Sequence, residues 1–190
     1  MGAPDGCESY LLPPVPAAIA DENPGLDVQI VALPRMFNLS RREADMAIGV
    51  PRPEAGRLTV QRIAGYRLHL AAGRAYLDAH GVPQTREDLR EHRIVGYIPD
   101  KIFDRELDYL TDLGNGRLQL ASNSVPVRLN WLRAGAGVGM ARAFAMPFAP
   151  ELVPVPADDI ALTRSFRLIR HADDARLSAW PVSPGCWQPD

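Results

Sequence analysis

The sequence predicts an α/β fold of two lobes, and three observations lead to this prediction. Short apolar runs with the character of strands alternate along the chain with segments of helical character. The first of these follow the order strand, helix, strand, which is typical of a parallel βαβ unit. A similar order recurs in the second half of the chain, and this repetition favours two lobes over one long sheet.

In the first half, Ser9 is the expected N-cap of a helix that ends at the stop signal Asn23-Pro24-Gly25. A β-branched run predicts a strand at residues 27–33, and the polar segment 37–43 predicts a helical turn. A loop rich in proline and glycine is expected at residues 51–56. Three further strands are expected at residues 46–50, 58–64 and 66–72, the last with Tyr66, Leu68 and Leu70 on one face.

In the second half, residues 74–80 predict a helix that ends at Gly81, and Thr85 with Asp88 resembles the capping box of a short helix. The residues Ser122, Asn123 and Ser124 are candidate N-caps for a helix at 125–134. Strands are expected at residues 94–97, 118–121, 138–141 and 166–171, with turns at 114–116 and 144–148 and a proline-punctuated stretch at 147–156.

Composition narrows the function classes. The 190 residues are 46% hydrophobic and 23% charged, which provides enough apolar material for a sizeable core. The formal net charge of −2 creates no basic field for a polyanion, so we expect no direct DNA contact from this chain. No export signal and no apolar run near the ~20 residues of a membrane span is present, so we expect a cytoplasmic protein with no membrane partner.

The glycine-rich segment Gly135-Ala136-Gly137-Val138-Gly139 superficially resembles a dinucleotide-binding fingerprint. That motif requires a strand, then the glycines, then a helix, whereas here a helix precedes the glycines and a strand follows them. We therefore interpret the segment as a helix C-cap and a tight turn, and expect no cofactor.

The residue types and their spacing give little support for a catalytic or metal site. His69, His80, His92 and His171 show no ligand spacing, no serine lies in a GxSxG motif, and Cys7 and Cys186 form no CxxC pair. A disulfide between the two cysteines is the alternative to two free thiols, which we expect. We read the acidic pairs Asp158-Asp159 and Asp173-Asp174 as solvated loop charges. We expect no enzyme, no catalytic residue and no bound metal.

Ser9 and the group Ser122-Asn123-Ser124 are the candidates for ligand binding, because each stands at an expected helix N-terminus. Such ends present unpaired amides and a partial positive charge, which suit a carboxylate or another anion. Ordinary N-capping is the alternative for each one alone. Two such ends, one in each half of the chain, favour a ligand site between two lobes.

The chain resembles the effector-binding domain of LysR-type transcriptional regulators over residues 5–176. The resemblance rests on four segments: SYLLPPVPAAIADENPGLDVQI, READMAIGV, RAYLDAHGVPQTREDLREHRIVGY and ASNSVPVRLNWLRAGAGVGMA. It implies a type 2 periplasmic-binding-protein-like fold, with two α/β lobes joined by two crossover strands. Lobe I is then expected at residues 1–67 and 148–190 and lobe II at residues 68–147.

The resemblance also implies a small-molecule effector, an organic acid among the candidates, bound between the lobes of a homodimer or homotetramer. The implied effector contacts are Glu8, Ser9, Tyr10, Pro34, Arg35, Gly49, Val50, Tyr97, Ser122, Asn123 and Ser124. The family's N-terminal winged helix-turn-helix has no counterpart here, the first strand is barely present before Asp5, and no closing helix follows Arg176. We therefore expect a chain truncated at both ends.

The expected function is ligand sensing within a LysR-type regulator. Three alternatives stay open at this point. They are a stand-alone small-molecule-binding protein of the same fold, a small α/β enzyme, and a regulator fragment without function.

Overall fold

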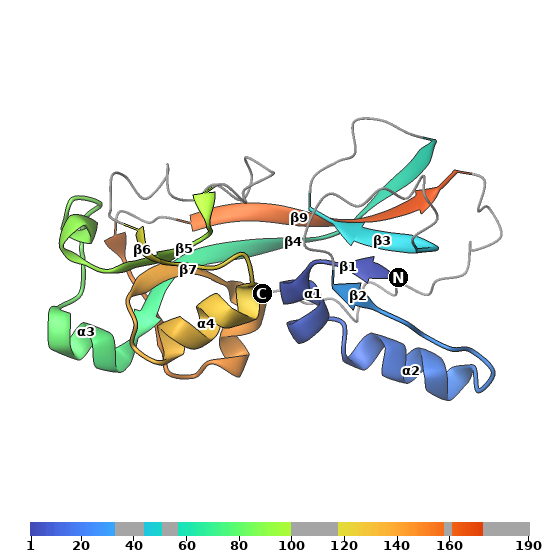
Figure 1. Cartoon of the computed structure of the whole chain (residues 1–190), viewed down its shortest axis with the longest axis horizontal. Coiled ribbons are helices and arrows are strands. Elements are labelled where there is room, and N and C mark those ends of the chain that lie inside the picture. The colour runs from blue at the N-terminus through green and yellow to red at the C-terminus, as the bar shows by residue number, and fades with distance from the viewer. Residues whose placement is uncertain (33–43, 51–56, 100–117, 158–160, 173–190) are drawn as a thin grey trace. The chain divides into compact units, whose positions relative to one another are not determined.

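The computed structural model describes residues 1–32, 44–50, 57–99, 118–157 and 161–172 (Figure 1). The chain forms two compact units, unit 1 from Met1–Tyr66 with Arg164–Asp190, and unit 2 from Arg67–Thr163. Two long strands, β4 (Leu58–Gly73) and β9 (Ala161–His171), contribute residues to both units. The chain therefore passes from one unit to the other twice.

Unit 1 is built on a mixed sheet with the strand order β2-β1-β3-β9. Strand β1 (Gly2–Ala3) lies between β2 (Val31–Ala32) and β3 (Met46–Gly49) and is parallel to both. Strand β3 pairs with β9 in antiparallel fashion. The first strand, barely visible in the sequence, is thus present as two residues within the sheet.

Two helices in unit 1 correct the prediction for residues 9–22. Helix α1 (Asp5–Tyr10) follows Pro4, and helix α2 (Pro14–Glu22) ends at Asn23 as expected. The prediction that Ser9 is an N-cap is therefore wrong, because Ser9 lies in the last turn of α1. Prolines 13 and 14 have no amide proton and cannot continue α1, so a second helix begins there.

The expected strand at 27–33 is shorter in the structure, because β2 contains only Val31–Ala32. It pairs with the two residues of β1, which limits the ladder to that length. The strand predicted at 46–50 is confirmed as β3. The helical turn at 37–43, the loops at 51–56 and 114–116, and the segment after Arg176 lie outside the described residues.

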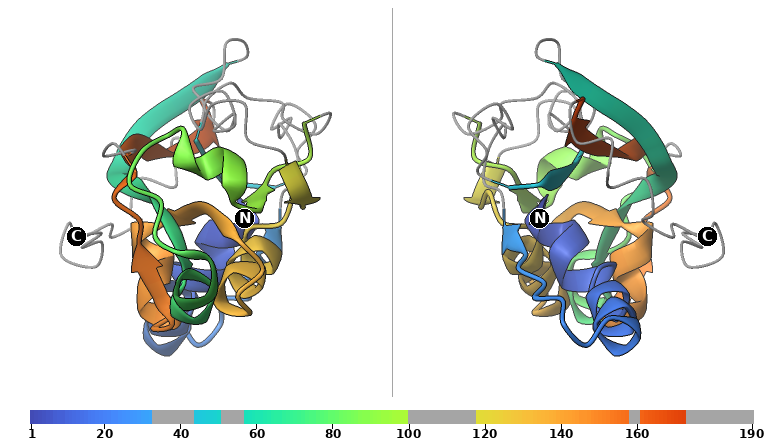
Figure 2. Two further views of the ribbon diagram at one scale, coloured as in Figure 1. Left: turned by 90° about the vertical axis from the view of Figure 1, so that its left-hand side faces the viewer. Right: turned by 90° about the vertical axis from the view of Figure 1, so that its right-hand side faces the viewer.

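The structure corrects the two strands predicted at 58–64 and 66–72, which are one continuous strand, β4 (Figure 2). Its first part lies beside β9, where the rings of Tyr66 and Phe166 stack with centroids 4.5 Å apart. Its second part pairs with β7 and β8. Pairing with β9 and then with β7 and β8 favours one long strand through Gly65, although glycine is unfavourable within strands. The alternation is confirmed, since Tyr66, Leu68 and Leu70 are buried and Arg67 is exposed.

Unit 2 follows the predicted order closely. Its helices are α3 (Arg74–His80) and α4 (Val125–Arg133), with 3₁₀ helices at Asp88–Glu91 and Ala143–Phe148. Its strands are β5 (Ile94–Gly96), β6 (Leu118–Ala121), β7 (Val138–Arg142) and β8 (Leu152–Pro154). Strand β5 lies between β6 and β7 and is parallel to both. Strand β8 is an addition to the prediction.

The capping box is confirmed. The Thr85 amide donates a 2.9 Å hydrogen bond to the Asp88 carboxylate, and the Asp88 amide donates a 3.3 Å hydrogen bond to the Thr85 hydroxyl. These contacts, with a hydrogen bond from the Gln84 amide, hold the pKa of Asp88 below its usual value.

The glycine-rich segment after α4 is a helix C-cap and a tight turn, as predicted. Gly135 adopts φ +73°, its amide donates to the Leu132 carbonyl, and the Ala136 amide donates to the Trp131 carbonyl. This pair of hydrogen bonds defines a Schellman motif. Gly139 has a separate role, because a Cβ there would overlap the Val95 carbonyl oxygen of β5. The glycines therefore close a helix and allow two strands to approach.

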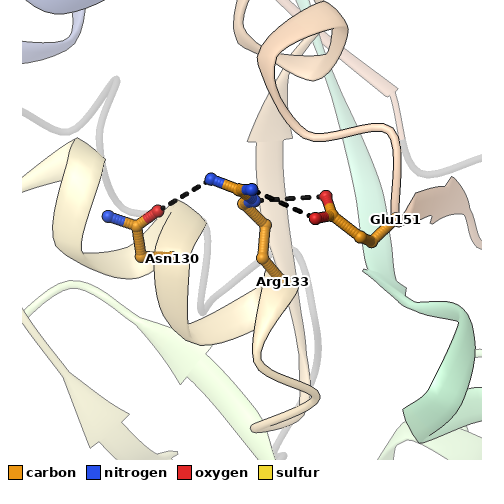
Figure 3. Close-up of polar contacts among 3 residues, drawn as sticks. All are labelled: Asn130, Arg133 and Glu151. Atoms are coloured by element: carbon orange, nitrogen blue, oxygen red, sulfur yellow. Dashed lines mark hydrogen bonds and ion pairs between the residues drawn. The ribbon is translucent and has the colours of Figure 1, made fainter.

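Residues 148–163 belong to unit 2, whereas the lobes implied by the resemblance place them in lobe I. Strand β8 pairs with β4 within unit 2. Arg133 at the end of α4 also binds both carboxylate oxygens of Glu151, at 3.1 and 3.0 Å, and contacts Asn130 (Figure 3). The lobe boundaries of a working sensor stay a prediction.

Candidate functional site

Four of the expected effector contacts lie together in unit 2, where β5 and β6 end. Tyr97 directly follows β5, and Ser122, Asn123 and Ser124 connect β6 to α4. The Ser122 amide donates a 3.0 Å hydrogen bond to the Gly96 carbonyl, which ties the two segments to each other. Because β5 and β6 are parallel, their carboxyl ends lie at the same edge of the sheet.

Ser124 is the N-cap of α4, as predicted, but its hydroxyl forms no cap hydrogen bond within the described part of the chain. The Ser124 amide instead donates a 3.1 Å hydrogen bond to the Ser122 hydroxyl. Pro126, near the start of α4, has no amide proton that needs a cap. Ordinary capping therefore does not account for the Ser124 hydroxyl.

Two buried arginines meet at Tyr97, and sequence reasoning missed both. The guanidinium carbon of Arg128 lies 3.5 Å from the centroid of the Tyr97 ring, a cation–π contact. Arg142 donates a 3.2 Å hydrogen bond from Nη2 to the Tyr97 hydroxyl. Arg128, Arg142 and Tyr97 are 3%, 6% and 8% exposed. Arginine is seldom this deeply buried unless it is paired.

A signal for Arg128 was present in the sequence. Arg128 lies on the same side of α4 as the apolar residues Val125, Leu129 and Leu132, all of which are buried. Its Nε and its amide both donate hydrogen bonds of 3.3 Å to the Ser124 carbonyl. Arg142, by contrast, ends β7 one residue beyond the predicted strand. No pattern in the neighbouring residues predicts that its side chain is buried.

Among the described residues, two guanidinium groups and the start of α4 lie at this end of unit 2. The two guanidinium groups stay charged at every physiological pH. The N-terminal end of α4, where Ser124 lies, adds the partial positive charge of the helix dipole. This arrangement suits an anionic group.

In unit 1, the expected contacts form two groups. Glu8, Ser9 and Tyr10 share the last turn of α1, with Ser9 exposed and the others half-buried. Gly49 ends β3 opposite Arg167 of β9, and the carbonyl of Val50 accepts a hydrogen bond from the Arg167 guanidinium. Pro34 and Arg35 lie outside the described residues.

The thiol of Cys7 is placed unfavourably for nucleophilic chemistry. Burial and the nearby Glu8 carboxylate raise the pKa of the Cys7 thiol to about 12, so the nucleophilic thiolate is scarce. Cys186 lies outside the described residues.

Within the described ranges, no group of three His, Cys, Asp or Glu side chains is arranged to hold a metal ion. No described helix combines the length and apolar character needed to cross a membrane.

Comparison with known proteins gives the family. The model of the LysR substrate binding domain matches residues 1–180. An uncharacterized HTH-type transcriptional regulator of Haemophilus influenzae is 25% identical over 157 residues, which cover 76% of this chain and 53% of that protein. The HTH-type transcriptional regulator CrgA of Neisseria meningitidis is 27% identical over 88 residues, 46% of this chain and 29% of CrgA. The chain thus spans about half the length of the first of these relatives.

Solved structures agree on the fold. The regulatory domain of CrgA superposes with a TM-score of 0.77 at 21% identity, over 92% of this chain and 88% of that domain. The full-length Vibrio cholerae virulence activator AphB superposes with a TM-score of 0.72 at 20% identity, over 91% of this chain and 61% of AphB. The predicted type 2 periplasmic-binding-protein-like fold is confirmed. The chain belongs to the LysR substrate-binding domain family, whose members are the regulatory domains of transcriptional regulators.

Proposed function

We propose that this chain is the sensing domain of a LysR-type regulator and that it binds a small organic acid to control transcription. The observation that supports this proposal most is the hydrogen bond from the Ser122 amide to the Gly96 carbonyl, which brings the segment before α4 to the end of β5, next to Tyr97. Hydroxyl groups and guanidinium groups are donors that suit a carboxylate.

The expected contacts are divided between unit 1 and unit 2. A sensor of this kind requires an effector that binds with different affinity to two states of the chain. This difference in affinity, rather than tight binding by itself, shifts the population of the two states. The shift then alters the assembly of a homodimer or homotetramer, in which a separate domain contacts DNA and the effector domain stays in the cytoplasm.

Thermal unfolding of the purified chain tests the proposal. A ligand that binds the folded state raises the midpoint by mass action. We expect at least one small organic acid from a panel of aliphatic and aromatic carboxylates to raise it in a concentration-dependent way. Ser124→Ala should reduce this rise, whereas the matched control Arg90→Gln, at an exposed position of unit 2, should keep it. A cooperative transition that no acid shifts would contradict the proposal.

Oligomeric state is a separate part of the proposal. Sedimentation of the purified chain should show a dimer or tetramer at micromolar concentration. A monomer at all concentrations, with and without the stabilising acid, would contradict this part alone.

A further inference from the structure

We propose that the contact of His92 with Tyr76 is an acid-sensitive element of unit 2. While His92 is neutral, this contact holds residues 90–92 next to α3, and proton uptake by His92 separates the two while the sheet of the unit stays folded. The inference concerns regulation by pH and does not depend on the proposed effector.

The His92 ring is buried beside an aromatic ring and lacks a polar partner. The side chain is 6% exposed, and the centroids of the His92 and Tyr76 rings lie 5.8 Å apart. Nδ1 of His92 is buried and has no hydrogen-bond partner within the described part of the chain. A protonated imidazole carries a hydrogen on both ring nitrogens, so a proton added here creates a charged ring with an N–H that finds no acceptor. Burial of such a group is costly, and exposure of the ring to water removes this cost.

The charged groups around His92 act in both directions. On α3, His80 stacks on Tyr76 with the ring centroids 4.3 Å apart, and a positive charge on His80 opposes a proton on His92. On the 3₁₀ helix, the carboxylates of Asp88 and Glu91 favour that proton. Burial is the largest influence, so the pKa of His92 lies below its usual value. The packed arrangement therefore favours the neutral ring.

The position of His92 in the fold confines the movement to a short segment. His92 directly follows a four-residue 3₁₀ helix, whose start is held by the fully buried Leu89 and by the capping box described above. After it, the Arg93 guanidinium donates to the Ala136 carbonyl at 3.1 Å, and the chain enters β5, which is paired on both sides. Short 3₁₀ turns have poor hydrogen-bond geometry, so residues 90–92 open more readily than the sheet.

The Arg93 amide reports this opening, because it donates a 2.9 Å hydrogen bond to the Tyr76 hydroxyl of α3. The experiment measures amide hydrogen exchange of the whole chain by NMR at pH 7.5 and pH 5.5, corrected for the intrinsic rate at each pH. An exposed histidine has a pKa of about 6.5, so the equilibrium constant for opening at Arg93 should rise by up to about tenfold between these values.

The Val155 amide, which donates a 2.8 Å hydrogen bond to the Leu70 carbonyl of β4, serves as the reference for the sheet. It should be better protected than the Arg93 amide at both pH values. Low concentrations of urea should accelerate exchange at Val155 and hardly change it at Arg93, because a local opening exposes little surface.

The variant His92→Phe keeps an aromatic ring against Tyr76 but cannot take up a proton, so protection at Arg93 should be the same at both pH values. His80→Gln is the matched control, because it removes the exposed histidine of the same cluster and should leave the pH dependence in place. If His92→Phe does not fold, the NMR titration of the His92 ring in the wild-type chain replaces it. The midpoint of this titration should coincide with the loss of protection at Arg93.

Four results overturn the inference. Protection at Arg93 that does not change with pH in the wild-type chain would show that no acid-sensitive contact exists. A pH dependence that persists in His92→Phe, or a His92 titration at a different pH, would assign the effect to another group. Equal responses of Arg93 and Val155 to urea would show that the unit unfolds as a whole. The proposed function survives all four results, because none of them involves a small molecule.

Discussion

The guanidinium carbon of Arg128 lies 3.5 Å from the centroid of the Tyr97 ring, which joins the start of α4 to the end of β5. Arg142 donates to the hydroxyl of the same ring from β7. One aromatic side chain therefore connects three elements of unit 2, and it follows directly after the strand that lies between β6 and β7.

Tyr97→Phe tests the two contacts separately. The variant keeps the ring face for Arg128 but removes the hydroxyl that accepts from Arg142, so we expect the free energy of unfolding to fall by about 1–2 kcal/mol. Tyr97→Leu removes both contacts and should lower it further. Urea denaturation of the two variants measures the difference, and equal stability of Tyr97→Leu and the wild type would contradict the structural role.

Gly139→Ala should prevent close pairing of β5 and β7. A Cβ at Gly139 would overlap the Val95 carbonyl oxygen, and backbone cannot move aside without separating the strands. We expect a loss of at least about 3 kcal/mol in the free energy of unfolding, large enough to reduce the yield of folded protein. Gly25→Ala is the control, because nothing lies within 4 Å of a Cβ there. A folded Gly139→Ala chain with wild-type stability would show that this approach is not required.

Stability should fall in mildly acidic solution because of His92. This side chain is 6% exposed, Nδ1 has no hydrogen-bond partner among the described residues, and the ring packs against Tyr76. Burial, with a smaller effect of His80, lowers the pKa of His92, although Asp88 and Glu91 act in the opposite direction.

The unfolded chain therefore takes up this proton at a higher pH than the folded chain. The free energy of unfolding should decrease as pH falls below about 6.5, the usual pKa of histidine, towards the lower pKa of the folded state. Urea denaturation between pH 8 and pH 5 measures this decrease. His92→Gln should make this decrease smaller, whereas an unchanged decrease in His92→Gln would assign the effect to other groups.

The ion pair between Arg133 and Glu151 should hold β8 next to α4 (Figure 3). Arg133 lowers the pKa of the Glu151 carboxyl, so the stabilisation is present above the usual glutamate pKa and is lost as pH falls through the lower pKa of the folded state. Glu151→Gln should increase amide hydrogen exchange at Arg74, whose amide donates to the Glu151 carbonyl.

The effect of Glu151→Gln should be small and should shrink in salt, because the side chains of Arg133 and Glu151 are 38% and 48% exposed. Glu87→Gln, an exposed carboxylate of the same unit, serves as its control. Unchanged exchange at Arg74 in Glu151→Gln would show that strand pairing alone holds β8.

Much of unit 2 was predictable because local chemistry decides it. Helix α3 matches the predicted residues 74–80, the Thr85–Asp88 capping box forms, and Gly135 ends α4. Each signal lies within a few residues of the feature that it specifies. The group Ser122-Asn123-Ser124 was located for the same reason, since caps and turns depend on neighbouring residues.

Local sequence patterns were enough to predict the α/β class and the helix ends of unit 2, and four segments indicated the family. Tertiary contacts are needed to show that β4 is one strand, that the two residues of β1 lie within the sheet, and that Arg128 and Arg142 meet at Tyr97. The cause is distance along the chain. A strand is extended by hydrogen bonds to partners far away in sequence, and a buried guanidinium is positioned by side chains from other elements. The residues adjacent in sequence therefore predict neither the length of the strand nor the position of the guanidinium.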